Sequence, residues 1–552
     1  MAYFRDLSDR LASDSRTDGI MPDPEQGIGR ECYAFSPIED RLIENLEQEA
    51  LTILDKLPSD CYAINRDAVG NLFIRLHGFD PSAKKVMTGS HIDSVRNGGM
   101  YDGVLGIVAG MDLLKQIVDS GVQPKNDFVV VAFRAEESSP KTGNAYLASA
   151  IATGTISEQE LEAISYRLDD GRVIPFKIYF NLKYGPDVWN AILHELENPP
   201  IRPQDILLFE ELHIEQSSVI QSQNSQVGVV MGGVGGSERM EFNGNEPLKG
   251  ERIETDEYQG YQVTITGERG HTGGTPMNST ANVEDGENYY RSDAIVGGAY
   301  FTNLLLSRCQ KSGIDVRINA ANVEEDLGFT TIPPKFTIRL ACDKDSFDRF
   351  NDIFEEVKEE TSRKKRVNVC GNFIATAGKE ALYKEEVWEV FSSVFHVEYA
   401  ARKINVERGG LGTVRSTIVD LKLVPGAPVS FKIDLREVMR KDGAELSKEV
   451  RGIVEDLRGK VRDIAYSRSE VLDDQVADFT QSIADELGLS YVRMPSVPGH
   501  DAVSLSKIGV KTGMIFVKHD GVSHSPKEHV EDEDVENALM LYRELLSRYL
   551  AK

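Results

Sequence analysis

Histidines and carboxylates that could hold metal ions recur where apolar segments of the chain end. The residues concerned are His91, Asp93, Asp102, Glu136, Glu137, His213, Glu215 and His524. Imidazole nitrogens and carboxylate oxygens are ligands of borderline divalent ions such as Zn²⁺, Mn²⁺, Co²⁺ and Ni²⁺. Three histidines and two carboxylates, one of them shared, would hold two ions and leave open positions for water.

Each of these features has a simpler explanation when it is taken alone. A single loop histidine is more often a surface or cap residue, and adjacent glutamates commonly lie in a solvated turn. The spacing of His91 and Asp93 has a firmer reason, because a metal-bound imidazole usually needs a carboxylate at its other nitrogen. No cysteine lies near these positions in the sequence, which disfavours a structural zinc site. Their joint recurrence favours a metal centre.

The segments around these residues are predicted to alternate between strands and helices. KKVMTGSHIDSV is an apolar run that ends in a polar loop, and Phe128 to Phe133 is a buried type of strand followed by two glutamates. Between them, GVLGIVAGMDLLKQIVDSG is an amphipathic helix that stops at Gly121. Buried strands separated by helices indicate a parallel or mixed α/β sheet, in which ligands bind beyond the carboxyl ends of the strands.

The middle of the chain has a different character. VGVVMGGVGGSERMEF is glycine-rich and is predicted to be a hinge. It is followed by strands (YQVTITG, FTTIPPKFTIRLAC, VSFKIDLREV) and amphipathic helices (DAIVGGAYFTNLLLSRC, AELSKEVRGIVEDLRGKV), which suggest a separate α+β domain. The α/β pattern returns near residue 470. We therefore expect one domain formed by residues 1–232 and 471–552, interrupted by an inserted domain of residues 233–470.

Composition narrows the class of protein. The 552 residues carry a formal net charge of −27, which argues against nucleic acid or an anionic membrane as a partner. No apolar run reaches the ~18 residues of a membrane span, and the N-terminal residues lack the apolar core of a signal peptide. The five cysteines are scattered without CxxC spacing, which fits a reducing compartment. We expect an acidic cytoplasmic protein.

Blocks of the sequence resemble the hydantoinase/carbamoylase branch of the two-metal exopeptidase–amidohydrolase superfamily. Members of that branch include N-carbamoyl-L-amino acid hydrolase, β-ureidopropionase and allantoate amidohydrolase. The matching blocks, in family order, are GSHIDSVRNGGMYDGVLGIVAG, FRAEESS, ELHIEQ, GERGHTGGTPM, RSDA, VPGAPVSFKIDLR, GHDA and GMIFVKHDGVSHSPKE. The resemblance implies an α/β fold: a catalytic domain with a mixed, mostly parallel sheet flanked by helices, interrupted by an inserted α+β lid and dimerisation domain.

The resemblance also implies a set of metal ligands. His91 and His213 would complete one site, and Glu137 and His524 the other, with Asp102 bridging them. The cofactors would be two divalent metal ions per chain, of Zn, Mn, Co or Ni.

Three catalytic roles follow from the same resemblance. Glu136 would be the general base that takes a proton from a metal-bridging water and later passes it to the leaving nitrogen. Asp93 would orient His91. His271, from the inserted domain, would stabilise the tetrahedral oxyanion.

The residues that would contact the substrate match the family less closely than the metal ligands do. Gln216 would line the pocket, and Arg436 would clamp the substrate carboxylate. His500, with Asp501, would border the site or serve only as a loop hydrogen-bonding residue. Lys422 stands where the family commonly has an asparagine that holds the carboxylate, so it suggests a different or more anionic group.

These features favour a hydrolase that cleaves the C–N bond of an N-carbamoyl (ureido) amino acid or related ureido acid to amine, CO₂ and ammonia. His213 supports this reading, because exopeptidase relatives usually have a carboxylate there. One alternative is an aminoacylase, dipeptidase or amidase of the same superfamily, and another is a binding or assembly protein that has lost catalysis. We expect a small-molecule carboxylate substrate and a homodimer formed through the inserted domain. The chain is also longer than such relatives, with extra residues near 165–205, 281–290 and 320–415.

Overall fold

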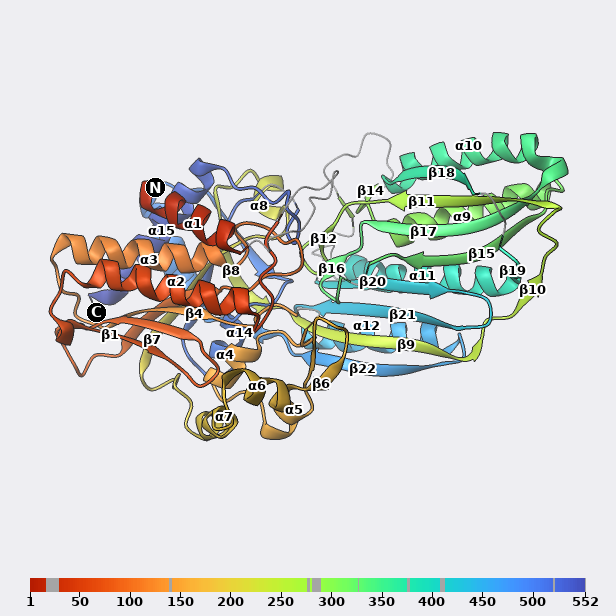
Figure 1. Ribbon diagram of the computed structural model, residues 1–552. Helices are drawn as coiled ribbons and strands as arrows, with labels where there is room; N and C mark the ends of the chain where they lie inside the picture. Colours follow the sequence, from red (N-terminus) through yellow and green to blue (C-terminus); the bar gives the residue numbers. More distant parts are fainter. Residues whose placement is uncertain are drawn as a thin grey trace. The chain divides into compact units, whose positions relative to one another are not determined.

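The long strands of the chain belong to two large sheets, each in its own compact unit (Figure 1). Unit 1 consists of Met1–Gly236 and Arg468–Lys552, and unit 2 consists of Ser237–Ser467. The computed structural model describes residues 1–15, 29–138, 141–275, 278–279, 289–325, 327–374, 378–407, 413–519 and 522–551. Because both ends of the sequence contribute to unit 1, unit 2 is an insertion within it.

The sheet of unit 1 is mixed, with parallel strands at its centre. Ladders β3–β4, β3–β7 and β7–β25 are parallel, whereas β1–β2, β2–β4 and β8–β25 are antiparallel. This arrangement confirms the mixed α/β fold predicted from the sequence. The strand order is β1 (Tyr62–Arg66), β2 (Leu72–Leu76), β4 (Phe128–Phe133), β3 (Lys85–His91), β7 (Ile206–Ile214), β25 (Thr512–Val517), β8 (Val227–Val234) and β23 (Glu470–Val471), with β24 (Tyr491–Ser496) also paired to β8.

Helices cover both faces of this sheet. Alternate residues of β4 point into two different hydrophobic cores, which shows that each face is buried. The first core includes α1 (Ala2–Asp14), α2 (Pro37–Leu54), α3 (Val104–Ser120), α13 (Asp474–Leu487) and α15 (Asp532–Leu550). The second includes α4 (Leu147–Ala152), α8 (Val219–Ser222) and α14 (Ala502–Lys507).

Helix boundaries in unit 1 follow local signals in the sequence. Ser36 caps α2 by accepting a hydrogen bond from the backbone N–H of Glu39, and Pro37 occupies the first turn, where no N–H is needed. Helix α3 ends at Gly121, which adopts a left-handed conformation with φ 67°. This is the end predicted from the sequence.

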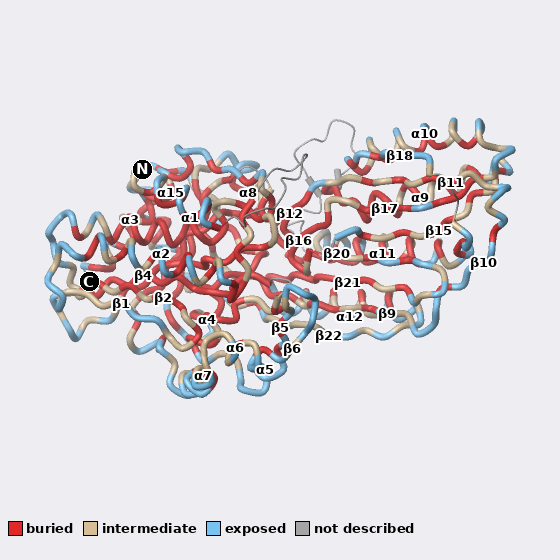
Figure 2. Tube along the Cα trace, in the orientation of Figure 1, coloured by how far each residue is buried: buried red, intermediate tan, exposed pale blue. Residues whose placement is uncertain are grey.

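An additional subdomain follows β4 and contains the expected extra residues 165–205. Phe176, Phe180 and Trp189 pack with Phe35 in a small aromatic core, with ring centroids 5.0–6.1 Å apart. Figure 2 shows that much of its outer surface is exposed. The elements of this subdomain are α5 (Glu158–Glu162), β5 (Ser165–Arg167), β6 (Val173–Pro175), α6 (Phe176–Tyr184) and α7 (Val188–Glu197). Elsewhere in unit 1, the short helix η1 (Ser59–Cys61) lies just before β1.

Unit 2 has a largely antiparallel sheet with helices packed on it. The strand order is β18 (Asn368–Ile374), β11 (Tyr258–Thr266), β17 (Lys335–Asp343), β15 (Val316–Val323), β20 (Val414–Leu423), β21 (Pro428–Glu437), β9 (Gly236–Pro247) and β22 (Gly459–Ser467). The helices are α9 (Ala294–Lys311), α10 (Phe347–Lys365), α11 (Lys384–Glu407), α12 (Arg440–Glu455) and the short η2 (Lys344–Ser346). Short pairs are β10 (Gly250–Arg252) with β19 (Glu380–Leu382), β12 (Gly270–His271) with β16 (Thr331–Ile332), and β13 (Asn278–Ser279) with β14 (Tyr289–Tyr290).

Three elements differ from the prediction. The glycine-rich segment expected to be a hinge forms β8 and the start of β9, although the boundary between units 1 and 2 falls within it, after Gly236. The strand expected over FTTIPPKFTIRLAC is divided into β16 and β17, because Pro333 and Pro334 between them have no N–H to donate to a ladder. The helix expected to reach Val461 ends at Glu455, and Arg458 adopts a positive φ of 54° before β22.

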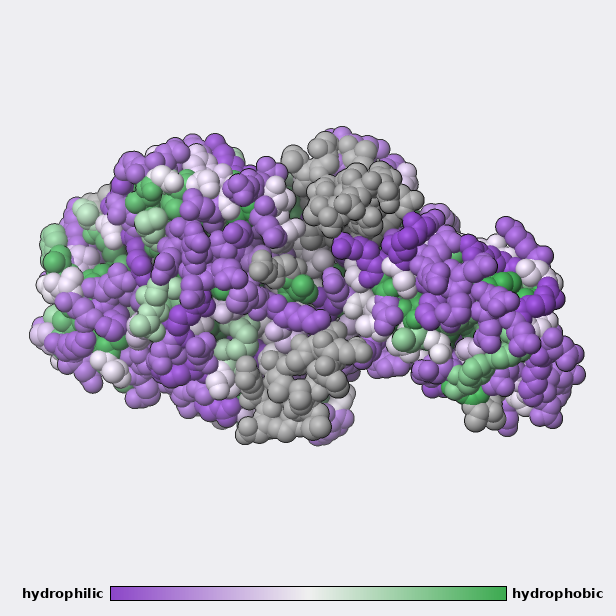
Figure 3. Space-filling model, turned by 90° about the horizontal axis from the view of Figure 1, so that it is seen from above, coloured by the Kyte–Doolittle hydropathy of each residue, from purple (hydrophilic) through white to green (hydrophobic). Residues whose placement is uncertain are grey.

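The surface carries mainly hydrophilic residues. Figure 3 shows small, separate apolar patches on both units in the view drawn. None of the helices in the described part of the chain has both the length and the apolar content needed to cross a bilayer. Of the extra residues expected at 281–290, residues 281–288 lie outside the described part.

Candidate metal centre

The candidate ligands of unit 1 lie at the carboxyl ends of neighbouring strands. His91 is the last residue of β3, and His213 is the penultimate residue of β7. Glu136 and Glu137 follow β4, and His524 follows β25. Because β4, β3, β7 and β25 are adjacent and parallel, their carboxyl ends meet at one edge of the sheet. All five side chains are buried.

Asp102 lies between two groups of these side chains. Its Oδ1 is 3.3 Å from Nε2 of His213 and 3.7 Å from Nε2 of His91. Its Oδ2 is 3.4 Å from Nε2 of His524, which in turn is 3.3 Å from Oε1 of Glu137. Within each group, the candidate ligand atoms lie within 4.8 Å of one another. One carboxylate therefore faces both groups, with a different oxygen toward each.

The hydrogen bonding of His213 shows that a positive charge fits between Nε2 of His213 and Oδ1 of Asp102. Its Nδ1 lies 2.9 Å from the carbonyl oxygen of Ile214, which can only accept, so Nδ1 carries a proton. In a neutral imidazole, the lone pair of Nε2 then faces Oδ1 of Asp102. Both atoms are buried, and neither has a hydrogen-bond partner among the described residues. Two facing acceptors are stable only with a proton or a cation between them, and these donors suit a divalent metal ion.

Asp93 connects His91 to the two glutamates. Its Oδ1 accepts a hydrogen bond from the backbone N–H of Glu136 at 3.0 Å, and its Oδ2 accepts one from Glu137 at 3.1 Å. The same Oδ1 is 3.5 Å from Nδ1 of His91. Ala135, just before the glutamates, has a positive φ of 51°, so the chain turns sharply there. Asp93 thus fixes the ends of two neighbouring strands against each other.

Two buried carboxyl groups of the centre have pKa values that are shifted in opposite directions. Burial raises the pKa of Glu136 well above its usual value; His91 opposes this shift, and the charge of Glu137 adds to it. Burial also tends to raise the pKa of Asp102, but the facing imidazoles of His213 and His91, when they carry a proton toward the carboxylate, hold that pKa well below its usual range. Asp102 is therefore ionised, whereas Glu136 has a raised affinity for protons, as a general base requires.

Gln216 and Ser523 orient the shared carboxylate. Nε2 of Gln216 donates to Oδ2 of Asp102 at 2.9 Å, and Oγ of Ser523 donates to the same oxygen at 3.2 Å. Gln216 adopts a positive φ of 59°. The resemblance implied a place for Gln216 in the substrate pocket, and the structure places its amide beside Asp102. Ser523 was not predicted.

His500 lies beside His213, and Glu211 completes a further group with them. The rings of His500 and His213 are 4.4 Å apart, and Oγ of Ser496 lies 3.0 Å from Nε2 of His500. Glu211 accepts hydrogen bonds from Ser90 at 2.7 Å and from the backbone N–H of residue 502 at 3.0 Å. Sequence reasoning missed Glu211. Its position two residues before His213 in a strand could have revealed it, because such residues share a face.

His271 and Arg436 are neighbours within unit 2. Nδ1 of His271 accepts hydrogen bonds from the backbone N–H groups of Gly273 and Gly274 at 3.0 and 2.6 Å, so the ring proton resides on Nε2. A Cβ at Gly273 would lie 3.0 Å from Cε1 of His271 and 3.3 Å from Cγ of Arg436. Nε of Arg436 donates to Asp434 at 2.6 Å. Both side chains are buried.

Lys422 lies elsewhere in unit 2. It is exposed on β20 and pairs with Ser430, whereas Arg436 pairs with Arg415 near the other end of the same hairpin. Seven residues of strand, at about 3.3 Å each, separate the two pairs by roughly 20 Å. The structure does not bring Lys422 next to Arg436 or His271.

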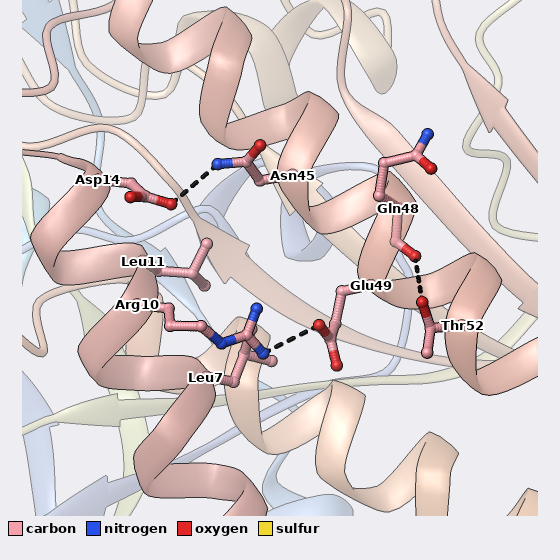
Figure 4. A pocket seen from close by; sticks show the side chains of 8 residues that line it. All are labelled: Leu7, Arg10, Leu11, Asp14, Asn45, Gln48, Glu49 and Thr52. Atoms are coloured by element: carbon pink, nitrogen blue, oxygen red, sulfur yellow. Dashed lines mark hydrogen bonds and ion pairs between the residues drawn. The ribbon is translucent and has the colours of Figure 1, made fainter.

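A hollow between α1 and α2 has a different chemistry (Figure 4). Its walls carry the ion pair of Arg10 with Glu49, at 2.9 Å, and the hydrogen bond from Asn45 to Asp14, at 2.9 Å. The lining consists of Leu7, Arg10, Leu11, Asp14, Asn45, Gln48, Glu49 and Thr52. This lining contains no histidine, so it lacks the donor set of the metal centre.

Comparison with known proteins places this geometry in context. The model of peptidase family M20/M25/M40 matches residues 87–548. The chain is 25% identical over 475 residues to an N-carbamoyl-L-amino-acid amidohydrolase of Pseudomonas sp. (strain NS671), covering 86% of this chain and 83% of that one. It is 23% identical over 517 residues to allantoate deiminase 2 of Glycine max, covering 92% and 84%. A hydantoinase/carbamoylase-family amidase from Burkholderia multivorans has a similar fold, with a TM-score of 0.53, 17% identity, and coverage of 100% and 97%.

Proposed function

Because the chain belongs to peptidase family M20/M25/M40, we propose that it is a dinuclear amidohydrolase that cleaves a ureido C–N bond. The substrate class is an N-carbamoyl amino acid or a related ureido acid. The resemblance drawn from the sequence blocks is confirmed at the level of the family, and the chain is a metal-dependent hydrolase of that family. The ureido assignment is supported by the names of the relatives, which act on carbamoyl amino acids and allantoate.

The position of Asp102 is the observation that carries this proposal. One oxygen faces His91 and His213, and the other faces His524, which is paired with Glu137. In the proposal, each group holds one divalent ion of Zn, Mn, Co or Ni. Two such cations, when bound, lower the pKa of a water molecule toward neutrality and polarise a carbonyl group.

Glu136 moves the proton in this proposal. Its buried carboxylate, 3.8 Å from Nε2 of His91, accepts a proton from the attacking water. It then gives the proton to the nitrogen that leaves, and the C–N bond breaks. Cleavage of a carbamoyl group releases the free amine and carbamate, which decomposes to CO₂ and ammonia. Asp93 keeps Glu136 in place through the backbone bond described above.

Unit 2 supplies two further groups in this proposal. His271 carries its ring proton on Nε2, so that atom can donate to the oxyanion that forms on the carbamoyl oxygen. Arg436, whose Nε donates to Asp434 and whose Nη2 donates to Oγ1 of Thr272 at 3.4 Å, would bind the substrate carboxylate through its guanidinium. We further propose that unit 2 forms the contact of a homodimer, which light scattering of the purified protein would test.

The test is ammonia release by protein reconstituted separately with Mn²⁺, Co²⁺ and Zn²⁺. The substrates are N-carbamoyl α- and β-amino acids, allantoate and ureidoglycolate, with the Glu136→Gln variant as the blank. We expect release that depends on metal, is absent from the blank, and persists in Glu195→Gln, a change to a carboxylate on α7 outside the centre. Amine release from N-acyl amino acids or dipeptides, without ammonia from any ureido substrate, would replace this proposal with an aminoacylase or dipeptidase.

A further inference from the structure

We propose that Arg30 and Glu528 are positioning residues that hold the peptide groups of Asp102 from both sides and thereby set the metal affinity of the centre. This inference rests on the proposed function in that it takes Asp102 to be a metal ligand. It concerns two residues that are distant from Asp102 in the sequence and that do not contact the reacting atoms.

Arg30 binds the carbonyl side of Asp102. Its guanidinium is fully buried, with Nη1 donating to the carbonyl oxygen of Asp102 at 3.0 Å. Nη2 donates to the carbonyl oxygen of Ile92 at 2.5 Å, and Nε donates to Oγ of Ser15 at 3.1 Å. One planar side chain therefore joins the residue after His91 to Asp102.

The segment that carries Arg30 is itself paired with the loop that precedes Asp102. The backbone of Arg30 forms a bridge with Gly98, with N–H to oxygen distances of 3.1 and 2.8 Å. Cys32 exchanges two hydrogen bonds with Ser94, at 2.7 Å to the backbone carbonyl and 2.9 Å to Oγ. This pairing fixes the direction from which the Arg30 guanidinium enters.

Glu528 binds the amide side of Asp102. Its Oε1 accepts hydrogen bonds from the backbone N–H of Tyr101 at 2.8 Å and of Asp102 at 3.1 Å. The side chain is buried, and it follows His524 by four residues on the same loop. Glu528 thus connects the loop of one candidate ligand with the backbone of the shared one.

Asp102 needs these contacts because the loop that carries it, residues 92–103, has little regular structure to hold it. Residues 92–103 run from β3 to α3 without a ladder of their own, apart from the bridge at Gly98. Asp102 must nevertheless present two oxygens to two groups of side chains. Hydrogen bonds to both its N–H and its C=O prevent its peptide planes from rotating. Loss of partners that orient a ligand typically weakens metal affinity about 10- to 100-fold.

The experiment compares Glu528→Ala with Glu528→Gln. Zn²⁺ affinity is measured by competition with a chromogenic chelator, on protein whose folding is verified by circular dichroism and by apoprotein melting. We expect Glu528→Ala to bind Zn²⁺ about 10- to 100-fold more weakly. Glu528→Gln keeps an oxygen that can accept both backbone bonds, so its affinity stays within about threefold of wild type. Equal losses in both variants would show that the charge of Glu528 matters rather than its positioning, and would overturn the proposal.

Two further variants keep the test decisive if Glu528→Ala does not fold. A Cβ at Gly99 would lie 2.1 Å from the Glu528 carboxyl, so Gly99→Ala displaces that group without removing it. Arg30→Met removes the bonds on the carbonyl side. We expect weaker Zn²⁺ binding in both, and no change in Arg543→Met, which removes the ion pair between Arg543 on α15 and Asp112 on α3. Wild-type affinity in Gly99→Ala and Arg30→Met would overturn the proposal.

The affinity readout separates this inference from the proposed function. If wild type binds Zn²⁺ and the variants lose affinity as expected, the positioning role holds even when no ureido substrate is cleaved. If ureido substrates are cleaved but the variants bind Zn²⁺ as wild type does, the proposed function holds and the positioning role fails.

Discussion

Gly103→Ala is expected to damage the metal centre through His91 without altering any ligand. Gly103 follows Asp102 and begins the turn into α3 with φ 74° and ψ −54°, a conformation that residues with a Cβ rarely adopt. A Cβ there would lie 2.5 Å from Cε1, Nδ1 and the carbonyl oxygen of His91. The new methyl group and the imidazole cannot both keep their places.

The size of the effect follows from the strain of the backbone at residue 103 and from the displacement of the His91 imidazole. Holding alanine in such a conformation costs about 1–3 kcal/mol of folding free energy. Restoring ordinary contact between the methyl group and the ring requires a shift of about 1 Å, and a misplacement of about 1 Å at a reacting centre can cost on the order of 100-fold in rate. We therefore expect lower stability, weaker metal binding and a rate reduced by about two orders of magnitude.

A matched control separates backbone strain from displacement of the ring. Gly121 also has a positive φ, 67°, but a Cβ there would meet no atom within 4 Å. Gly121→Ala is therefore expected to lose stability by about 1 kcal/mol while metal content and rate stay unchanged. The measurements are denaturant unfolding, metal content by emission spectroscopy, and turnover. Wild-type metal affinity and turnover in Gly103→Ala would refute the placement of His91 in the centre.

Three other substitutions test separate parts of the molecule. Arg436→Lys keeps the charge beside Asp434 but loses the planar fork, so KM for carboxylate substrates should rise at least tenfold with a smaller change in kcat; an unchanged KM would place the carboxylate elsewhere. Burial and the charge of Glu195 raise the pKa of Asp67 to about 7, so folding takes up protons and wild type loses stability as the pH rises from about 4 to about 7. Glu195→Gln lowers that pKa, and its melting temperature should fall less than that of wild type between about pH 5 and pH 8. Phe180→Ala opens the aromatic core of α6 and α7 and should cost about 3–5 kcal/mol in denaturant unfolding, whereas a loss below about 1 kcal/mol would show that this core adds little.

The strands that carry the candidate ligands could be predicted from sequence because their signals are local. The run Phe128–Phe133 is apolar on both faces and is followed directly by Glu136 and Glu137, and β4 has the predicted bounds. Once such strands are taken as parallel neighbours, the rule for carboxyl ends brings their polar residues together. His91 and His213 could be placed near each other by the same reasoning.

The residues that support the centre could not be predicted, because their contacts are long-range and involve the backbone. Arg30 and Glu528 reach Asp102 from 72 and 426 residues away and bind its peptide groups, which have no sequence signature. Lys422 illustrates a second limit. The resemblance gave it the position where the family commonly has an asparagine that holds the substrate carboxylate, but the register of the β20–β21 hairpin decides where it lies, and register depends on a turn that includes Gly426 at φ 76°.

The position of β25 has a consequence for the order in which the chain matures. This strand lies between β7 and β8, yet the ribosome makes it after all of unit 2. Until residues 512–517 emerge, β7 and β8 each present an unpaired edge, while the continuous segment Ser237–Ser467 already has everything it needs to fold. His524 and Glu528 follow directly after β25. Closure of the sheet and assembly of the candidate ligands are therefore expected to occur together, late in biosynthesis, and a nascent chain interrupted before this point is expected to aggregate through the exposed edges of β7 and β8.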